Sequence, residues 1–315
     1  MAQKVPNKTL MDSGISNWTA DRLPDLKGKL YVITGGNSGI GFEAAKHLGN
    51  AGADIVLACR SVAKAENAAK DLRALISGQV DVVQLDLSDL VSVRTAAAAM
   101  RAKYSQIDCL INNAGVMQTP KQQTADGFEM QFGTNHLGHF LWTGLLIDLV
   151  DAAAGRVVTL SSIAHLSGEI RFDDLMGEKG YSPTAAYLQS KGANLMFALE
   201  LDRRLQVAGK KATSIACHPG YSNTNLQSAG PTGIFSFLYK FTNPLLAQSS
   251  SDGALPTALA AAGTEARRGG YYGPQKMGET RGPVGDAKVA AYILDEAAAK
   301  RLWDVSETLV GHTWL

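Results

Sequence analysis

The chain has 315 residues, of which 45% are hydrophobic, so it is long enough to bury a large core. A formal net charge of +1 without a basic block argues against nucleic acid as the main partner. No apolar run is long enough to span a membrane, and residues 1–27 lack an apolar signal core. Cys59, Cys109 and Cys217 lack the spacing of metal ligands, so we expect buried, reduced thiols, no metal site and a cytoplasmic protein.

Apolar runs alternate with alanine-rich helical stretches along the chain. This alternation predicts a doubly wound, mostly parallel sheet flanked by helices, the α/β architecture known as the Rossmann fold. Helices are expected at residues 42–51, 62–76, 90–104 and 135–150, and around Tyr187. Seven strands are expected, at residues 29–34, 54–59, 80–85, 107–112, 156–160, 211–217 and, at a sheet edge, 270–273.

No linker or repeat divides the chain, so we expect one domain over residues 28–315, preceded by a surface arm at residues 1–27. Residues 223–253 are rich in glycine, proline and serine and contain the apolar run 234–239, which predicts a lid-like insertion. A subunit contact or a membrane-surface patch is the alternative, although the run lacks the basic face of an interfacial helix. The tail at residues 283–315 is expected to end in a helix.

A glycine-rich turn joins the first predicted strand to the first predicted helix. Glycines permit a tight turn and a close approach of diphosphate, and the new helix offers free N–H groups and a positive dipole end. The spacing Gly-x-x-x-Gly-x-Gly differs from the general dinucleotide fingerprint, and no Walker A Lys-Ser/Thr pair follows it. An ordinary strand–helix turn is the alternative. We predict that a dinucleotide contacts Gly35, Asn37, Ser38, Gly39, Ile40 and Gly41.

The end of the second strand indicates which nicotinamide cofactor fits. An acidic residue there would bind the ribose 2′-hydroxyl, whereas arginine suits a 2′-phosphate. This strand is followed by Arg60 and Ser61, with Lys64 one helical turn later, and no acid is present. We therefore predict NADP(H) rather than NAD, with solvated surface charges as the alternative.

Two further strand ends fit the same ligand. Asp86 and Leu87 follow the third strand, where the acid can meet the adenine amino group, although Asp86 could equally cap the next helix. The fourth strand leads into Asn113, Ala114 and Gly115, an amide and a tight turn that suit a ribose.

Tyr187 and Lys191 lie four residues apart, which places them on one face of the predicted helix. An adjacent cation favours the phenolate, so the pair can make tyrosine an acid or base near neutral pH. Tyr272 and Lys276 have the same spacing, but Gly273 and Pro274 break a helix between them. Only the first copy is therefore expected to act as a pair.

Together these features make the chain resemble the short-chain dehydrogenase/reductase family over most of residues 28–225. Residues 58–60, 134–140 and 218–220 are similar to the retinol dehydrogenase branch, which, like the related protochlorophyllide reductases, mostly uses NADP(H). The long insertion of those reductases is missing, so photochemistry is not expected. The resemblance is carried by the loop 34–41, Asp86, Asn112 to Gly115, Asn135, Ser161, Ser162, Tyr187, Lys191, Pro219 and Gly220.

The resemblance implies a role for each of these residues. Tyr187 would be the proton donor or acceptor, and Lys191 would lower its pKa and hold the nicotinamide ribose. Ser162, the second serine of its pair, would polarise the substrate oxygen, and Asn135 would support a water relay to Lys191. The residues facing the nicotinamide end would be Pro219, Gly220 and Thr224.

Each residue also has a structural reading. Tyr187 could be a packed helix tyrosine, Asn135 a helix N-cap, and Ser162 the end of a strand. His136 and His139 are expected to be packed or hydrogen-bonded histidines of a helix.

The leading hypothesis is an NADP(H)-dependent oxidoreductase that interconverts a carbonyl and an alcohol on a hydrophobic substrate. A catalytically silent NADP-binding regulator on the same fold is the alternative. The resemblance is compatible with a homodimer or homotetramer, and monomers also occur in these branches.

Overall fold

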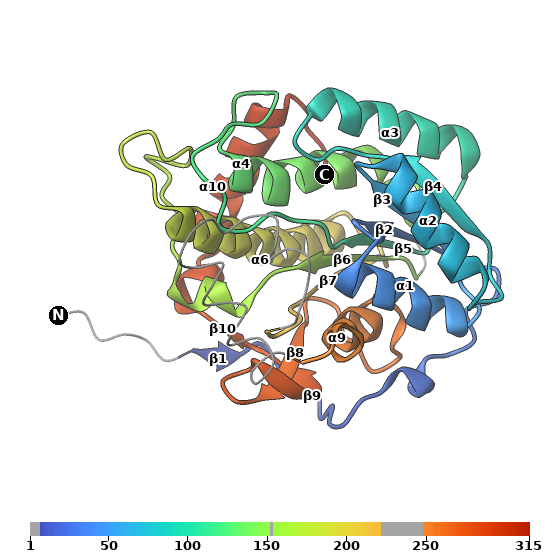
Figure 1. The fold of residues 1–315 in the computed structure, drawn as a ribbon. Helices are drawn as coiled ribbons and strands as arrows, with labels where there is room; N and C mark the ends of the chain where they lie inside the picture. Colours follow the sequence, from blue (N-terminus) through green and yellow to red (C-terminus); the bar gives the residue numbers. More distant parts are fainter. Residues whose placement is uncertain (1–6, 152–153, 222–247) are drawn as a thin grey trace.

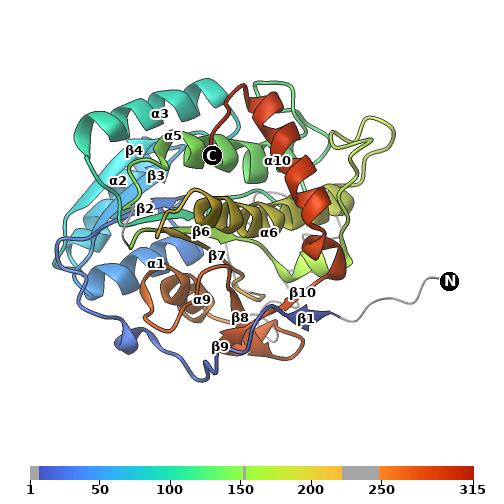
Figure 2. The same ribbon diagram turned by 180° about the vertical axis from the view of Figure 1, so that it is seen from behind.

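The computed structural model describes residues 7–151, 154–221 and 248–315 as a sheet with helices on both faces (Figure 1, Figure 2). The main sheet has eight strands in the order β4-β3-β2-β5-β6-β7-β8-β9, and all are parallel except β9. The strands are β2 (Leu30–Thr34), β3 (Asp54–Cys59), β4 (Val80–Gln84), β5 (Cys109–Asn112), β6 (Arg156–Leu160), β7 (Thr213–Cys217), β8 (Tyr271–Lys276) and β9 (Arg281–Asp286).

Two helical layers cover the two faces of this sheet, each over its own hydrophobic cluster (Figure 1). Strand side chains alternate between the layers, so Val32 joins one cluster while Tyr31 and Ile33 join the other. One layer holds α3 (Leu90–Lys103), α5 (Gly138–Leu146), α6 (Pro183–Val207) and α10 (Glu296–Val310). The other holds α1 (Gly39–Asn50), α2 (Val62–Arg73) and α9 (Ser250–Ala262).

The expected fold class is correct, but the sheet has one strand more than the seven predicted. The additional strand β9 pairs antiparallel with β8 at the sheet edge. Its sequence, Arg-Gly-Pro-Val-Gly-Asp, contains two glycines and a proline and therefore lacks the usual signature of a strand. Such residues are tolerated here because an edge strand needs few ladder bonds.

The N-terminal segment is not a simple surface arm where the structure describes it. Its strand β1 (Lys8–Thr9) pairs with β10 (Lys288–Val289) in a second, two-stranded sheet. Trp18 is only 1% exposed, and its indole Nε1 donates to Glu265 Oε2 at 3.1 Å. The segment is held along the β9 edge because burying this large aromatic side chain is favourable.

The lid predicted at residues 223–253 overlaps the start of α9, and the rest of it stays a prediction. Ser249 caps α9 by accepting from Asp252 N, and the helix then packs against α1 and the sheet. Its alanines are buried, so this is a core helix and not a cover. Residues 222–247, including most of the expected lid and Thr224, lie outside the described residues.

The helix expected at residues 135–150 starts earlier and is irregular. Glu129 caps α4 (Met130–Phe132), a π-helical turn follows at Gly133–Leu137, and α5 ends at Leu146. The reading of Asn135 as an N-cap is therefore wrong, because it lies inside this helical segment. The C-terminal tail ends as expected in α10, whose Trp303 packs on Trp314 with ring centroids 4.5 Å apart. In the described ranges, no helix has the length and apolar character needed to cross a bilayer.

Candidate active site

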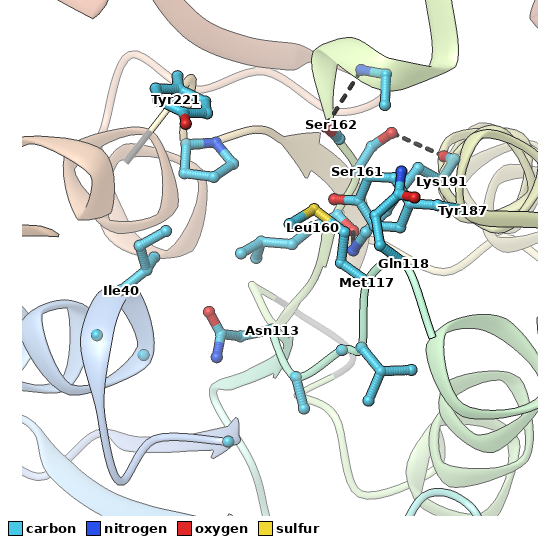
Figure 3. A pocket seen from close by; sticks show the side chains of 18 of the residues that line it. Ile40, Asn113, Met117, Gln118, Leu160, Ser161, Ser162, Tyr187, Lys191 and Tyr221 are labelled. Carbon is cyan, nitrogen blue, oxygen red and sulfur yellow. Dashed lines mark hydrogen bonds between the residues drawn. The ribbon is translucent and has the colours of Figure 1, made fainter. Parts of the chain in front are cut away.

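A cleft of about 500 Å³ opens where the parallel strands end (Figure 3). Its lining comes from the segments that follow β2, β3, β5, β6 and β7, together with the first turns of α6. Parallel strands have their carboxyl ends at one edge of the sheet, so residues far apart in sequence meet there. Predicted residues in the lining are Gly35, Asn37, Ser38, Gly39, Ile40, Gly41, Arg60, Asn113, Ala114, Gly115, Ser162, Tyr187, Lys191, Pro219 and Gly220.

The glycine loop forms a bare cradle at the N-terminus of α1. Gly35 and Gly39 adopt left-handed backbone angles, with φ of +66° and +55°. At Gly41, a side-chain carbon would lie 2.6 Å from both Gly35 O and Asn113 Nδ2. The loop therefore fits closely against the turn after β5, and its shape suits a diphosphate bound to free helix N–H groups.

Thr34 joins the two halves of this cradle through its hydroxyl group, which accepts hydrogen bonds from Asn113 N at 2.9 Å and Ala114 N at 3.0 Å. His139 Nδ1 contacts Asn135 O, a pure acceptor, so Nδ1 carries the proton and Nε2 accepts from Thr34 Oγ1 at 2.8 Å. Burial lowers the pKa of His139 to about 4, which keeps the ring neutral for this contact. The sequence did not identify Thr34 as a structural link.

Other predicted cofactor residues lie outside the cleft lining. Ser61 caps α2 by accepting from Lys64 N at 3.4 Å. The carboxylate of Asp86 accepts from Ser88 Oγ at 2.6 Å, while the neighbouring Asp89 caps α3, so the capping alternative for Asp86 is wrong. The assignment of Ser61, Lys64, Asp86 and Leu87 to the adenosine end stays a prediction.

Arg60 lines the outer end of the cleft, directly after β3. Its side chain is exposed, and it makes no hydrogen bond or ion pair with any other residue that the structure describes. A guanidinium group is thus available to a ligand anion at this end of the cleft.

The two serines after β6 differ in what their hydroxyl groups can reach. Ser161 is 2% exposed and donates to Lys191 O at 2.7 Å, which fixes it against α6. Ser162 is partly exposed, and its hydroxyl accepts from Ala164 N at 3.2 Å, leaving its proton available to the cleft. The geometry therefore favours Ser162 as the serine that contacts substrate.

Tyr187 and Lys191 lie one turn apart on α6 and both line the cleft (Figure 3). The Lys191 ammonium is 6.0 Å from the centre of the Tyr187 ring and donates to Leu160 O at 3.2 Å. Burial lowers the pKa of Lys191 to about 8, because the charged form loses its hydration. A buried cation beside a phenol is suited to stabilising a phenolate.

Asn135 lies behind the cleft and is fully buried. Its side chain accepts from Val116 N at 2.7 Å and donates to Val116 O at 2.9 Å and to Ser190 Oγ at 3.0 Å. Asn135 thus joins the loop after β5 to Ser190 of α6, which lies three residues beyond Tyr187. A π-helical turn is a common feature of functional segments, and here it contains this asparagine.

His218 is a positioning residue that the sequence did not reveal. Its Nδ1 accepts from Gly220 N at 3.2 Å, so the proton is on Nε2, which faces Glu279 Oε2 at 3.4 Å. Tyr221 N also donates to Thr280 O at 2.7 Å. The β8–β9 turn therefore holds the loop that carries Pro219 and Gly220 into the cleft.

The remaining histidines behave as buried structural groups. His136 contacts Ser306 Oγ at 2.9 Å, and burial lowers its pKa to about 3. His165 Nδ1 donates to Ser162 O at 2.6 Å, and its ring is fully buried. The expectation of hydrogen-bonded helix histidines is confirmed for His136 and His139.

The lining residues that sequence reasoning missed share one property: they lie beside a recognised motif without belonging to it. They adjoin the Asn113–Gly115 turn, the Ser161–Ser162 pair, Tyr187 or Gly220, and a sequence gives no signal of which such neighbours face inward. They are Val116, Met117, Gln118, Leu160, Ile163, Ala164, Leu188 and Tyr221.

Comparison with known proteins identifies related sequences and structures. The family model described as short chain dehydrogenase matches residues 29–232. Retinol dehydrogenase 12 of Mus musculus is 43% identical over 294 residues, covering 92% of this chain and 88% of that protein. Retinol dehydrogenase 13 of Homo sapiens is 42% identical, with 91% and 86% covered. The crystal structure of an uncharacterised protein from Mycobacterium paratuberculosis has a TM-score of 0.79 and 40% identity, over 95% of this chain and 99% of that one.

The relatives and the solved structure cover more than nine tenths of the chain, and together with the family model they confirm both the resemblance and the fold. The chain belongs to the short-chain dehydrogenase/reductase family, in its retinol dehydrogenase-like branch, and is an oxidoreductase that uses a nicotinamide cofactor.

Proposed function

We propose that the protein is an NADP(H)-dependent enzyme that interconverts a ketone or aldehyde and its alcohol on a hydrophobic substrate. One observation carries the proposal: Ser162, Tyr187 and Lys191 line the same cleft as the glycine cradle. A carbonyl carbon in this cleft can therefore lie near both a bound nicotinamide and a proton donor.

The nicotinamide supplies or accepts the hydride, as in other enzymes with this cofactor. In the reduction direction, the Tyr187 phenol gives its proton to the carbonyl oxygen, and Ser162 donates a hydrogen bond to the same oxygen. The buried Lys191 ammonium stabilises the phenolate that remains. Asn135 keeps the loop after β5 in register with α6 and so holds the proton donor in place. In the oxidation direction the same phenolate accepts the alcohol proton.

The apolar lining supports a hydrophobic substrate. Met117, Ile163, Ala164 and Leu188 line the same cleft as the reacting groups, and such a lining favours ligands with hydrocarbon or aromatic parts. Steady-state assays of hydrophobic ketones, aldehydes and alcohols with both nicotinamide cofactors test the proposal. We expect turnover of several of them. Tight NADPH binding with no turnover across the series would instead favour the catalytically silent regulator.

Cofactor choice is expected to depend on Arg60. Its exposed guanidinium can bind a 2′-phosphate, and no acidic residue at the β3 end repels that group. We expect Arg60→Ala to lower kcat/KM for NADPH about tenfold to a hundredfold, as the loss of one charge-assisted contact predicts. NADH should be affected less than about threefold. The exposed Lys70 on α2 provides the control, and Lys70→Ala should leave both cofactors unchanged. A native preference for NADH would contradict the assignment.

The homodimer or homotetramer and the cytoplasmic location stay predictions. Sedimentation of the purified protein and localisation of a tagged copy would test them.

A further inference from the structure

Gln118 occupies a strained position on the wall of the cleft. Its φ is +57°, a left-handed angle that is uncommon and strained for a non-glycine residue. Its N–H donates to Gln131 Oε1 at 2.8 Å, and Gln131 Nε2 donates to Pro183 O at 2.9 Å. The completely buried Gln131 thus holds the backbone of Gln118 against the start of α6. The strain persists because the surrounding structure fixes it, which is common at ligand sites.

The side chain of Gln118 is also oriented by its surroundings. Its Oε1 accepts from Thr184 Oγ1 at 3.1 Å. Thr184 lies in the first turn of α6, three residues before Tyr187. Because the carbonyl end of the amide is directed to Thr184, the NH₂ end carries two free donors. Across the described parts of the chain, no residue accepts from Gln118 Nε2.

This amide differs in character from the wall around it. Gln118, Met117 and Tyr187 all line the cleft and are labelled in the close view (Figure 3). Pockets of this kind use a few polar groups in an apolar wall to fix the orientation of a ligand. A partner for the amide must supply an acceptor atom. The apolar residues of the same lining include Val116, Met117, Ile163 and Leu188.

We propose that Gln118 is a specificity-determining residue that binds a second oxygen of the substrate, separate from the reacting carbonyl oxygen. The substrate class is therefore a carbonyl compound, or its alcohol, with a further acceptor oxygen such as an ester, ether or second carbonyl. This inference rests on the proposed function of Tyr187, because it places the reacting carbonyl beside that residue. Thr184 acts through Gln118 as a positioning residue.

Matched pairs of substrates test this proposal. Ethyl acetoacetate and ethyl levulinate carry an ester oxygen at two distances from the ketone, and straight-chain methyl ketones of equal length lack it. We expect the native enzyme to prefer at least one ester over its matched ketone about tenfold in kcat/KM, as one net hydrogen bond predicts. Gln118→Met keeps the length, the backbone N–H and the backbone strain, and should bring that ratio close to one. The methyl ketones themselves should change less than about threefold in this variant.

Two control variants separate recognition from folding. Met117→Leu changes the neighbouring apolar wall and should preserve the ester preference. Thr184→Val releases the amide and should lower the preference only in part, whereas Gln118→Glu removes both donors and should abolish it. An equal ester-to-ketone ratio in the native enzyme and Gln118→Met would overturn the proposal.

The Gln118 proposal can be tested whether or not turnover is detected. If no ketone is reduced, the proposed function fails, and the same pairs are then compared by calorimetry on the NADP-loaded protein. A tenfold stronger binding of the ester that disappears in Gln118→Met would support the Gln118 site. Equal affinities would reject it. Active enzyme with no ester preference rejects the Gln118 site and leaves the proposed function standing.

Discussion

The chain contains two Tyr-x-x-x-Lys sequences, and only one of them forms a pair. On α6, Tyr187 and Lys191 both line the cleft, with the ammonium 6.0 Å from the ring centre. On β8, Tyr272 is buried, and its hydroxyl accepts from Arg267 N at 2.8 Å, while Lys276 is exposed beyond an irregularity in the strand pairing.

The difference follows from the geometry of the two elements. Four residues rise about 6 Å along a helix and turn back to the same face. The same four residues extend about 13 Å along a strand, too far for the side chains to meet. A spacing therefore has chemical meaning only together with its element, and with the neighbours that the fold adds. The four predictions below test this contrast, from the largest expected effect to the smallest.

Replacing the two tyrosines should give the largest contrast. Tyr187→Phe removes the proton donor, and we expect kcat to fall about a hundredfold to ten-thousandfold. Tyr272→Phe leaves the cleft intact and should change kcat by less than about threefold. Steady-state kinetics on one substrate with NADPH measures both. Near-normal turnover by Tyr187→Phe would mean that neither Tyr-x-x-x-Lys sequence has a catalytic tyrosine.

Asn135 is a neighbour that the α6 pair has and the β8 pair lacks. Asn135→Ala removes three hydrogen bonds and leaves the backbone of Val116 without its buried partner. We expect the free energy of unfolding to fall by about 2–4 kcal/mol, as unsatisfied buried groups predict. Urea unfolding measures the change, and Asn50→Ala at the exposed end of α1 is the control. A variant as stable as the native protein would show that the joined loop does not depend on this side chain.

Burial of Lys191 should appear as a dependence of stability on pH. Its folded pKa of about 8 lies below the unfolded value of about 10.4, so the unfolded chain binds more protons between these values. The free energy of unfolding of the native protein, relative to Lys191→Met, should therefore rise by about 2–3 kcal/mol from about pH 8 to pH 10.

Unfolding at several pH values, without cofactor, measures this relative stability. Lys276→Met removes an exposed ammonium group and is the matched control, with an expected change within about 0.5 kcal/mol. If the difference in unfolding free energy between the native protein and Lys191→Met did not change with pH, the ammonium group would be hydrated in solution.

The smallest effect concerns the structural role of the second copy. The Tyr272 hydroxyl satisfies one backbone N–H, so Tyr272→Phe should lower the free energy of unfolding by about 1 kcal/mol. Thermal unfolding measures it, with Lys276→Met, which changes an exposed side chain and keeps Tyr272, as the reference. If Tyr272→Phe lost more unfolding free energy than Asn135→Ala, the expected order of the two effects would be wrong.

Elements with strong local patterns were predicted well. The strands Asp54–Cys59 and Arg156–Leu160 have the expected bounds, because buried parallel strands are continuous apolar runs. The strand Arg281–Asp286 was missed, since its glycines and proline conceal it and only pairing with β8 defines it. The start of the helix Ser250–Ala262 was assigned to a lid because residues 223–253 are rich in glycine, proline and serine.

The candidate site divides in the same way. The sequence by itself determined the glycine cradle and the Tyr187–Lys191 pair, because their geometry is set within one turn or one helix. Only the tertiary structure decided that the Ser161 hydroxyl donates to α6 while the Ser162 hydroxyl keeps its proton for the cleft, and that His218 meets Glu279. It also brought the amide of Gln118 to Thr184, 66 positions away. Such contacts form because separate strands end at the same edge of the sheet. No local sequence pattern specifies which distant residues meet there.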